Sequence, residues 1–258
     1  MNWKDRFPQE NIYFQTDNGI LYNAEAIKTM SKFPEKIFDA IITDPPYGTT
    51  ACKWDTVIPF EDMWRELKRI RKDRTPVVLF GSEPFSTLLR ASNLKEFRYD
   101  WIWNKKIPSG MNYAKYQPMR QHEIISVFYR KKCLYKPQME RRDKPIKAGG
   151  MKSSNSAGTK NYRALKKIYN YKYPISILSC QKIRQGSLHP TQKPIALLEY
   201  LIKTYTNEGD LVLDFTCGSG TTLLACEKLN RKWIGIEINP DYCEISKQRI
   251  LSIEKEIL

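Results

Sequence analysis

Asp-Ala-Ile-Ile-Thr-Asp-Pro-Pro-Tyr-Gly, residues 39–48, is the stretch that decides the fold of this chain. Its short run of apolar, β-branched residues predicts a buried strand over residues 39–43. Pro45 and Pro46 end that strand, because a proline fixes φ near about −65° and has no N–H to donate. A rigid turn at the carboxyl end of a buried strand is where open α/β sheets bind their ligands. The stretch therefore predicts an α/β fold with a ligand site at this turn.

The turn presents three groups that suit one kind of ligand. Asp44 supplies a carboxylate, Pro45 supplies a carbonyl with no local partner, and Tyr47 supplies a flat ring. Two hydrogen-bond acceptors beside a stacking surface suit a planar group that carries an NH2. The alternative is an ordinary loop at a strand end. Asp before the prolines and Tyr-Gly after them favour a site.

Length and composition indicate a chain with a substantial core. The 258 residues, 41% of them hydrophobic, suffice for one large α/β domain with an insertion or for two small domains. No run of about 18 apolar residues is present to cross a membrane, and the first residues are too polar for a secretory signal. Six cysteines lie far apart, and there are two histidines. This pattern argues against a zinc site and for reduced thiols, so we expect a cytoplasmic protein.

Most of the positive charge lies in one segment. The formal net charge is +15, and residues 131–185 contribute +13 of it through 15 Lys or Arg and two acids. Five tyrosines and a Gly/Ser/Asn-rich patch at residues 149–158 lie in the same segment. Basic residues interleaved with aromatic rings fit contacts to phosphates and bases. We expect a nucleic-acid-facing insertion that is partly flexible; a disordered, solvated insert is the alternative.

Two blocks of α/β pattern flank this insertion, so that the chain divides into residues 1–130, 131–185 and 186–258. Hydrophobic periodicity predicts the elements of both blocks. In the first block it predicts strands at residues 39–43, 77–81, 98–103 and 123–129, helices at 59–72 and 85–91, and a surface loop at 109–121. In the second block it predicts a helix at residues 195–205, strands at 211–215 and 233–238, a helix between those strands, and a last helix from 239 onward.

The second block holds a β-turn-α-β unit with a glycine-rich turn. Asp214 ends a predicted strand, and Phe-x-x-Gly-x-Gly follows at residues 215–220. Gly218 and Gly220 permit positive φ and a close backbone approach, and the next helix offers unpaired N–H groups. Glu237, at the end of the next strand, suits two ribose hydroxyls. Asp214 suits a cationic amine better than a pyrophosphate, which favours S-adenosylmethionine (AdoMet) over a dinucleotide, the alternative ligand.

Three motifs together resemble the AdoMet-dependent amino-methyltransferases of DNA, which act on adenine N6 or cytosine N4. They are Asp-Pro-Pro-Tyr at residues 44–47, His-Pro-Thr-Gln-Lys-Pro at 189–194 and Asp-Phe-Thr-Cys-Gly-Ser-Gly at 214–220. A catalytic motif first, a cofactor motif last and a target-recognition region between them is the order of the β group. The resemblance covers about residues 20–135 and 186–252. It implies a Rossmann-like fold with a mostly parallel, doubly wound sheet in circularly permuted order.

The resemblance also implies roles for individual residues. Asp44 and the Pro45 carbonyl would accept the hydrogens of the target amine, with Pro46 in the same turn and Tyr47 stacked on the base. The implied cofactor pocket consists of Glu25, Asp44, His189, Thr191, Lys193, Asp214, Phe215, Cys217, Gly218, Gly220 and Glu237. Within it, Glu237 would bind the ribose. Glu25 departs from the family, which commonly has Asp beside the cofactor's adenine.

In that family Asp-Pro-Pro-Tyr goes most often with N6-adenine methylation, and Ser-Pro-Pro-Tyr with N4-cytosine methylation. We therefore expect a site-specific enzyme that transfers a methyl group from AdoMet to N6 of a flipped adenine in double-stranded DNA. The alternatives are an N4-cytosine enzyme of the same fold, a catalytically inactive nucleic-acid-binding protein, and an RNA or protein methyltransferase. A cognate restriction endonuclease is a possible partner, and a monomer and a homodimer both stay open.

Overall fold

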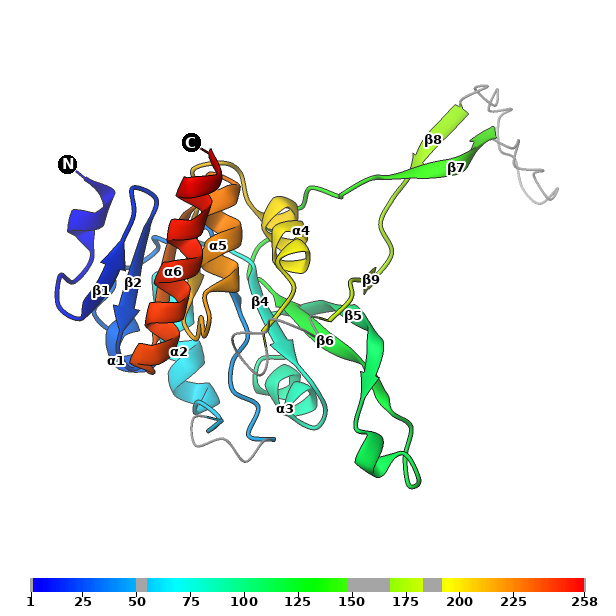
Figure 1. Ribbon diagram of the computed structural model, residues 1–258, viewed down its shortest axis with the longest axis horizontal. Coiled ribbons are helices and arrows are strands. Elements are labelled where there is room, and N and C mark those ends of the chain that lie inside the picture. Colours follow the sequence, from blue (N-terminus) through cyan, green and yellow to red (C-terminus); the bar gives the residue numbers. More distant parts are fainter. Residues whose placement is uncertain (1, 50–54, 148–167, 183–191, 258) are drawn as a thin grey trace, which may run out of the picture. The chain divides into compact units, whose positions relative to one another are not determined.

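Figure 1 shows the computed structural model, which describes residues 2–49, 55–147, 168–182 and 192–257. The chain forms two compact units: the first is Met1–Lys136 with Ser176–Leu258, and the second is Pro137–Ile175. No helix in the described ranges is long and apolar enough to span a membrane. The five cysteines within these ranges are free thiols.

One sheet forms the centre of the first unit. Nine strands of the described residues build it in the order β1-β2-β11-β10-β3-β4-β6-β5-β9. The five strands from β2 to β4 are parallel to one another, whereas β1 and β6 run antiparallel to their neighbours. The bounds are β1 (Ile12–Gln15), β2 (Gly19–Asn23), β3 (Ala40–Thr43), β4 (Val77–Gly81), β5 (Phe97–Ser109), β6 (Arg120–Phe128), β9 (Ile177–Ser179), β10 (Leu211–Asp214) and β11 (Lys232–Glu237).

Helices cover both faces of this sheet. The longer ones are α2 (Phe60–Ile70), α3 (Phe85–Ser92), α4 (Ile195–Tyr205), α5 (Thr221–Lys228) and α6 (Pro240–Ile257); α1 (Ala26–Met30) and the 3-10 turns η1 (Trp3–Arg6) and η2 (Met111–Tyr113) are short. Side chains of α4, α5 and α6 join one core cluster, and those of α1, α2 and α3 join another. Helices on both faces make the sheet doubly wound, as predicted.

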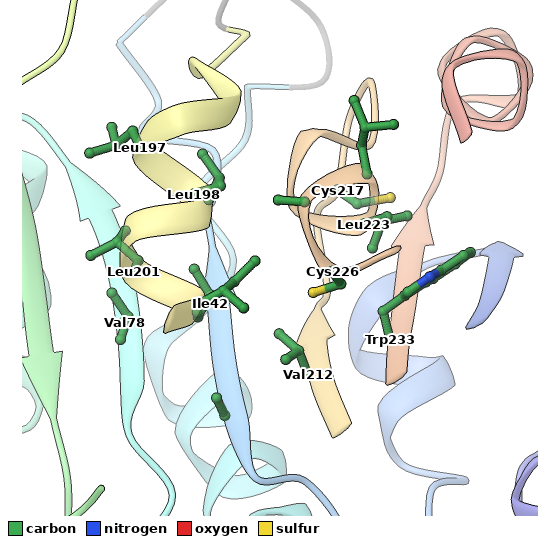
Figure 2. Close-up of a cluster of buried hydrophobic side chains, with 14 of the residues drawn as sticks. Ile42, Val78, Leu197, Leu198, Leu201, Val212, Cys217, Leu223, Cys226 and Trp233 are labelled. Atoms are coloured by element: carbon green, nitrogen blue, oxygen red, sulfur yellow. The ribbon is translucent and has the colours of Figure 1, made fainter. Parts of the chain in front are cut away.

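The central strands supply both clusters, because successive side chains of a strand point to opposite faces. Ile42 and Val78 belong to the cluster under α4, whereas Ile41 and Leu79 belong to the cluster under α2. Figure 2 shows Leu201 of α4 close to Ile42 and Val78. Burial on both faces explains why these strands are continuously apolar rather than alternating.

The strand order places the two predicted motifs side by side. β10 is followed by α5 and β11 in one direction of the sheet, and β3 is followed by α2 and β4 in the other. β10 and β3 are neighbours and parallel, so their carboxyl ends meet at the point where the winding reverses. Open α/β sheets bind ligands in the crevice at that point. The permuted order of the chain is therefore compatible with a single site.

The predicted elements of the parallel centre are confirmed. β4 and α4 have the predicted bounds, and most other elements differ by about one to three residues at their ends. β5 is longer than predicted and continues to Ser109. Residues 104–109, Asn-Lys-Lys-Ile-Pro-Ser, lack the apolar alternation that predicts a strand. The edge strands β1 and β9 were not predicted, since short and partly exposed strands carry little hydrophobic pattern.

The second unit contains an antiparallel pair of strands, β7 (Glu140–Lys147) and β8 (Ile168–Lys172). Three tyrosines within the described part of this unit are exposed: Tyr169, Tyr171 and Tyr173. This unit is narrower than the predicted insertion of residues 131–185, because both ends of that segment belong to the first unit. Cys133 is buried in the core there, the Lys136 N–H donates to the Thr204 carbonyl at 2.8 Å, and β9 pairs with β5.

Candidate active site

The turn after β3 carries the predicted catalytic residues at the carboxyl edge of the sheet. The Tyr47 hydroxyl donates a hydrogen bond to Asp44 Oδ1. The Tyr47 ring stacks on Phe85, the first residue of α3, with the two ring centroids 5.1 Å apart and the planes inclined by 28°. The hydroxyl and the ring are thus held at the same time, so Tyr47 presents a fixed aromatic face beside Asp44.

Asp55 fixes the second half of this turn. Its two carboxylate oxygens accept the N–H groups of Gly48 and Thr49, each at 2.9 Å. Gly48 has a φ of +68°, a left-handed conformation that favours glycine. No described residue donates a hydrogen bond to the Pro45 carbonyl. The turn is therefore rigid, and it keeps one backbone acceptor available next to the Asp44 carboxylate.

A buried group of charged side chains surrounds Asp44. Lys193, which precedes α4, donates from Nζ to Asp44 Oδ2. The same Nζ lies 3.3 Å from Glu123 Oε2, and Lys105 Nζ lies 3.4 Å from Glu123 Oε1. Two carboxylates and two ammonium groups thus alternate from β3 through the segment before α4 to β6 and β5. Since each charge has an opposite neighbour, the group is tolerated away from water.

The pKa values in this group follow from burial and from these neighbours. Burial raises the pKa of Asp44, and the Lys193 ammonium opposes that shift. Burial would also raise the pKa of Glu123, but Lys193 and Lys105 outweigh it and lower that pKa. The pKa of Lys193 is raised, because Asp44 and Glu123 together outweigh its own burial. Lys193 is consequently a persistent cation at the catalytic end of the site.

Two threonine hydroxyls link the turn after β3 to the turn after β10. Thr43 Oγ1 donates to Asp214 Oδ1 and lies 2.8 Å from Thr216 Oγ1. Thr216 Oγ1 in turn donates to the Asp44 carbonyl at 3.2 Å. Burial raises the pKa of Asp214 to about 6. The two turns are therefore held in one register, with Asp214 as a buried acid between them.

The glycine-rich turn leads to the acid at the end of β11. Gly218 has a φ of +53°, and its N–H donates to Glu237 Oε2 at 2.9 Å. The other oxygen, Glu237 Oε1, accepts the Asn239 N–H at 2.8 Å. Burial raises the pKa of Glu237. Both oxygens of this carboxylate retain further lone pairs, so Glu237 can still accept hydrogen bonds from a ligand.

These turns line a cavity of about 460 Å³, a volume typical of small-molecule sites. Its lining includes most of the predicted site residues: Glu25, Asp44, Pro45, Pro46, Tyr47, Lys193, Asp214, Phe215, Cys217, Gly218 and Glu237. Gly220 lies outside the lining; its φ is +72°, and a Cβ there would approach Ser246 Oγ to 2.7 Å. His189 and Thr191 lie outside the described residues.

Several residues of the site were not predicted from the sequence. Thr43, Thr216 and Asp55 fix the turns, and Glu123 and Lys105 complete the charged group. The signal for Glu123 was present, because an acid opens an otherwise apolar predicted strand. Glu25 plays a second role: its carboxylate accepts the N–H groups of Ile27 and Lys28 and so caps α1.

The residues of the cavity fit AdoMet. Gly218 has no Cβ where the backbone borders the cavity, so a ligand can approach the chain closely. The buried Asp214 carboxylate can hold the ammonium of an amino-acid tail, and Glu237 can accept hydrogen bonds from ribose hydroxyls. The Asp44 turn lines the same cavity. A cofactor and a second substrate would therefore meet in one enclosure.

Comparison with known proteins agrees with this arrangement. A model of the DNA methylase family, N6_N4_Mtase, matches residues 38–248. The Type II methyltransferase M.HpaI of Haemophilus parainfluenzae is 32% identical over 244 residues, which cover 88% of this chain and 72% of that protein. The Type II methyltransferase M.BamHI of Bacillus amyloliquefaciens is 27% identical over 266 residues, 95% of this chain and 60% of that one.

Solved structures show the same fold. The M1.HpyAVI-SAM complex superposes with a TM-score of 0.61 at 27% sequence identity, and the match covers 89% of this chain and 98% of that one. The cytosine-N4-specific PvuII DNA methyltransferase gives a TM-score of 0.67 at 18% identity, with 93% of this chain and 89% of that one covered.

Proposed function

Because this chain belongs to the N6/N4 family of AdoMet-dependent DNA methyltransferases, we propose that it methylates N6 of adenine in double-stranded DNA. The observation that carries the proposal is the pair of adjacent acceptors, Asp44 and the Pro45 carbonyl, beside the Tyr47 ring in the same cavity as Asp214 and Glu237. An exocyclic amine has two N–H groups and a flat ring behind it, which match these three features.

Asp44 and Pro45 act on the nucleophile. The lone pair of an exocyclic amine is delocalised into the base, so the amine is a weak nucleophile until its nitrogen becomes tetrahedral. When the carboxylate and the carbonyl accept the two N–H bonds, they favour that geometry and aim the lone pair into the cavity. AdoMet, bound there, supplies a sulfonium methyl group as the electrophile. Alignment of this kind supplies up to roughly 7–11 kcal/mol of a reaction barrier.

Asp44 has an electrostatic role as well. Positive charge develops on the amine nitrogen as the new N–C bond forms, and a carboxylate at hydrogen-bond distance stabilises it. This effect is stronger at a partly buried group than in bulk water, and the Asp44 side chain is 22% exposed. Tyr47 contributes differently, by stacking on the base that has left the duplex.

The DNA would be held by the basic segment. Residues 131–185 carry most of the net charge of the chain, and the strand pair β7 and β8 within them exposes tyrosines, Arg141 and Lys144. We propose this segment as the target-recognition region, in which cationic side chains neutralise phosphates. A two-stranded ribbon is one of the elements that the major groove of B-DNA admits.

One alternative has a specific observation in its favour. The fold also matches a cytosine-N4-specific enzyme, and the exocyclic amine of cytosine offers the same two N–H groups to Asp44 and Pro45. The residues Asp44 to Tyr47, which the motif associates with adenine, favour N6. The intact acceptors and the formed cavity argue against an inactive binding protein. Since relatives are Type II methyltransferases, we propose a restriction endonuclease as a functional partner.

Nucleoside analysis tests the proposal directly. The protein is incubated with unmethylated genomic DNA and methyl-labelled AdoMet, and the DNA is digested to nucleosides. Label in N6-methyladenine is the expected result. Label in N4-methylcytosine would show that the target is cytosine N4 rather than adenine N6, and the family assignment would be unchanged. Label in RNA or protein but not in DNA would overturn the assigned substrate.

A further inference from the structure

Both oxygens of the Asp44 carboxylate are engaged before any substrate binds. The Tyr47 hydroxyl donates to Oδ1, and Lys193 Nζ donates to Oδ2. The Lys193 side chain is only 8% exposed, and aromatic rings surround its ammonium. The centroids of Phe80 and Trp103 lie 5.2 and 5.9 Å from Nζ. The cation is therefore paired with the carboxylate that the proposed reaction uses as an acceptor.

An ammonium on Asp44 opposes the proposed chemistry in two ways. It takes up one lone pair of the carboxylate that would accept the amine N–H, and above all it cancels the negative charge that would stabilise the developing cation. Full use of the Asp44 charge therefore requires Lys193 to move off Asp44 when the target base binds. A buried ammonium without a carboxylate partner costs several kcal/mol, so it needs a second acceptor within reach of a small side-chain shift.

Glu123 is that second acceptor. Its Oε2 is buried and lies 3.3 Å from Lys193 Nζ, yet it makes no hydrogen bond within the described residues. Its Oε1 lies 3.4 Å from Lys105 Nζ, which holds the carboxylate in place. Glu123, in the first half of β6, thus offers an unused lone pair on Oε2 beside the Lys193 ammonium. A change of torsion angles in Lys193 suffices to transfer the hydrogen bond.

We propose that Glu123 is a positioning residue of the reaction: it takes over the Lys193 ammonium when the target amine binds to Asp44. This inference rests on the proposed function. The transfer moves no proton and breaks no covalent bond; it exchanges one ion pair for another. The target amine thus replaces the Lys193 ammonium on Asp44 as it binds. When no base is bound, Asp44 stays paired with Lys193.

The test is a double-mutant cycle on methyl transfer to DNA, with AdoMet affinity measured in parallel. In Glu123→Gln, Lys193 has only Asp44 as a charged partner, so kcat is expected to fall at least tenfold while the Kd for AdoMet changes less than twofold. In Glu123→Gln with Lys193→Met, the cation that blocks Asp44 is gone, so kcat is expected to rise above that of Glu123→Gln. Glu61→Gln, an exposed position on α2, serves as the matched control.

Three results would overturn the role of Glu123. The first is a wild-type kcat in Glu123→Gln. The second is additivity: the losses of kcat in the single variants Glu123→Gln and Lys193→Met multiply in the double variant. Additive effects of this kind would indicate that each residue has an independent, structural role. The third is a weakened AdoMet affinity in Glu123→Gln that accounts for the lost rate. Failure of the wild-type protein to methylate any DNA would instead overturn the proposed function.

A different observation concerns the long hairpin of β5 and β6. β4 ends at Gly81, which pairs with Ile124, whereas the β5–β6 ladder continues to the pair of Ser109 and Arg120. β5 runs parallel to β4, since both are antiparallel to β6. The hairpin therefore extends beyond the edge that carries Asp44, by about 15–20 Å at the usual rise per residue. Figure 1 shows this extension with η2 at its tip.

The tip of this hairpin is folded and has an unusual surface. Gly110, with a φ of +90°, starts the turn η2. Three large side chains follow with their surfaces in solvent: Met111 is 71% exposed, Tyr113 is 61% and Tyr116 is 86%. Residues 106–122 contain three Lys or Arg and no acid. Aromatic rings among cations are the combination that binds unpaired bases along a phosphate backbone.

We infer that this tip contacts the DNA next to the flipped base, where Tyr113 and Tyr116 stack on the bases that flipping leaves exposed. The inference rests on the proposed function. The tip and Asp44 belong to the same unit and lie at the same edge of the sheet, so a duplex with one base in the cavity passes the tip. Lys115, between the two tyrosines, meets a phosphate.

Binding measurements separate stacking from charge. Tyr113→Ala with Tyr116→Ala is expected to weaken binding of duplex DNA at least tenfold, with an unchanged salt dependence and an unchanged Kd for AdoMet. Lys115→Gln is expected to reduce the slope of log K against log salt by about 1. Leu94→Ala removes an exposed side chain, 68% accessible, at the opposite edge and is the control. Wild-type DNA affinity in the tyrosine variant, or loss of AdoMet binding, would overturn the inference.

Discussion

The side chain of Asp44 is where charge, burial and geometry meet in this molecule. Burial favours its protonated form, while the Lys193 ammonium and the hydrogen bonds from Lys193 and Tyr47 favour the carboxylate. An enzyme that needs an ionised acceptor in an enclosed site must include such partners, because desolvation alone would neutralise the acid.

Replacement of Asp44 separates catalysis from cofactor binding. Asp44→Ala is expected to lower kcat by at least about 100-fold, since it removes one preorganised group that stabilises developing charge. AdoMet affinity should stay within tenfold, about 1.4 kcal/mol, because Asp214 and Glu237 hold the other end of the cavity. Single-turnover assays and calorimetry measure the two quantities. Asp17→Ala, an exposed position near the start of β2, is the control; substantial activity in Asp44→Ala would refute the assignment.

Asp214 should make AdoMet binding depend on pH. Its pKa is raised by burial to about 6, so below that pH the free protein carries a neutral acid. An ammonium beside it favours the carboxylate, so binding there requires the loss of a proton. Affinity is therefore expected to fall by up to about tenfold per pH unit below pH 6 and to be constant from there to pH 7. Calorimetry in wild type and in Asp214→Asn tests this; a flat wild-type profile between pH 5 and 7 contradicts it.

Single residues were predictable where a motif is contiguous. Asp44 to Tyr47 and Asp214 to Gly218 are consecutive, and the structure brings both stretches to one cavity. Glu123 and Lys105 were missed because their contacts are made only in the folded chain. The pairing of β5 with β6 brings Lys105 to Glu123, and the segment before α4 brings Lys193 to Glu123. A contact of this kind depends on register, which a hydrophobic pattern does not encode for polar residues.

At the scale of elements, the start of α5 shows how a glycine can serve packing. Gly220 precedes the helix with a φ of +72°, and a Cβ there would lie 2.7 Å from Ser246 Oγ of α6. The close approach of α5 to α6 thus requires glycine at this position. The sequence predicted that Gly220 allows the backbone to approach the cofactor closely. Gly220 lies outside the cavity lining, so the packing of α5 on α6 is the role that its contacts support.

A pair of glycine variants measures this packing. Gly220→Ala is expected to lower the free energy of unfolding by about 2–4 kcal/mol, from backbone strain and from overlap with Ser246. Gly209→Ala is the matched control: its φ is +79°, but its Cβ would meet open space, so only the strain of about 1 kcal/mol applies. Urea unfolding gives both values. Equal losses would show that the contact with Ser246 has no energetic weight.

Helices and buried strands were predictable because their hydrophobic periods are strong, as in α4 and β4. The extension of β5 was not predicted as a strand, and its last residue, Ser109, was placed in a loop. Residues 104–109 are mostly polar, and the residues of β6 that pair with them are polar as well. Ladder hydrogen bonds hold this segment, and backbone bonds leave no trace in side-chain composition.

For the whole molecule, the sequence predicted the permuted order of the two motifs but not the limits of the second unit. Residues 131–136 belong to the first unit although they are as basic as the segment that follows, because Cys133 and the Lys136 backbone contact the core of that unit. Charge marks a binding surface, whereas packing marks a domain boundary.

Removal of the second unit should abolish recognition but not cofactor binding. Replacing residues 137–175 by a Gly/Ser linker removes a net charge of +8. DNA affinity at about 0.1 M salt is expected to fall at least tenfold, with a shallower salt dependence, while the Kd for AdoMet stays within twofold. A variant with serine at Tyr169, Tyr171 and Tyr173 keeps the charge and should keep the salt slope. Unchanged site-specific methylation by the deletion variant would exclude this unit from recognition.

The adjacency of β3 and β10 has a consequence for synthesis of the protein. The contact between Thr43 and Asp214 joins residues 171 positions apart. At about 5–20 residues per second, a ribosome needs roughly 10 to 35 s to add that length. During this interval the nascent chain displays the turn of Asp44 to Tyr47 while the side of β3 that pairs with β10 is bare. The cavity that both turns line can form only after β10 has left the ribosome, so a chain that ends before Asp214 lacks the pocket proposed for AdoMet.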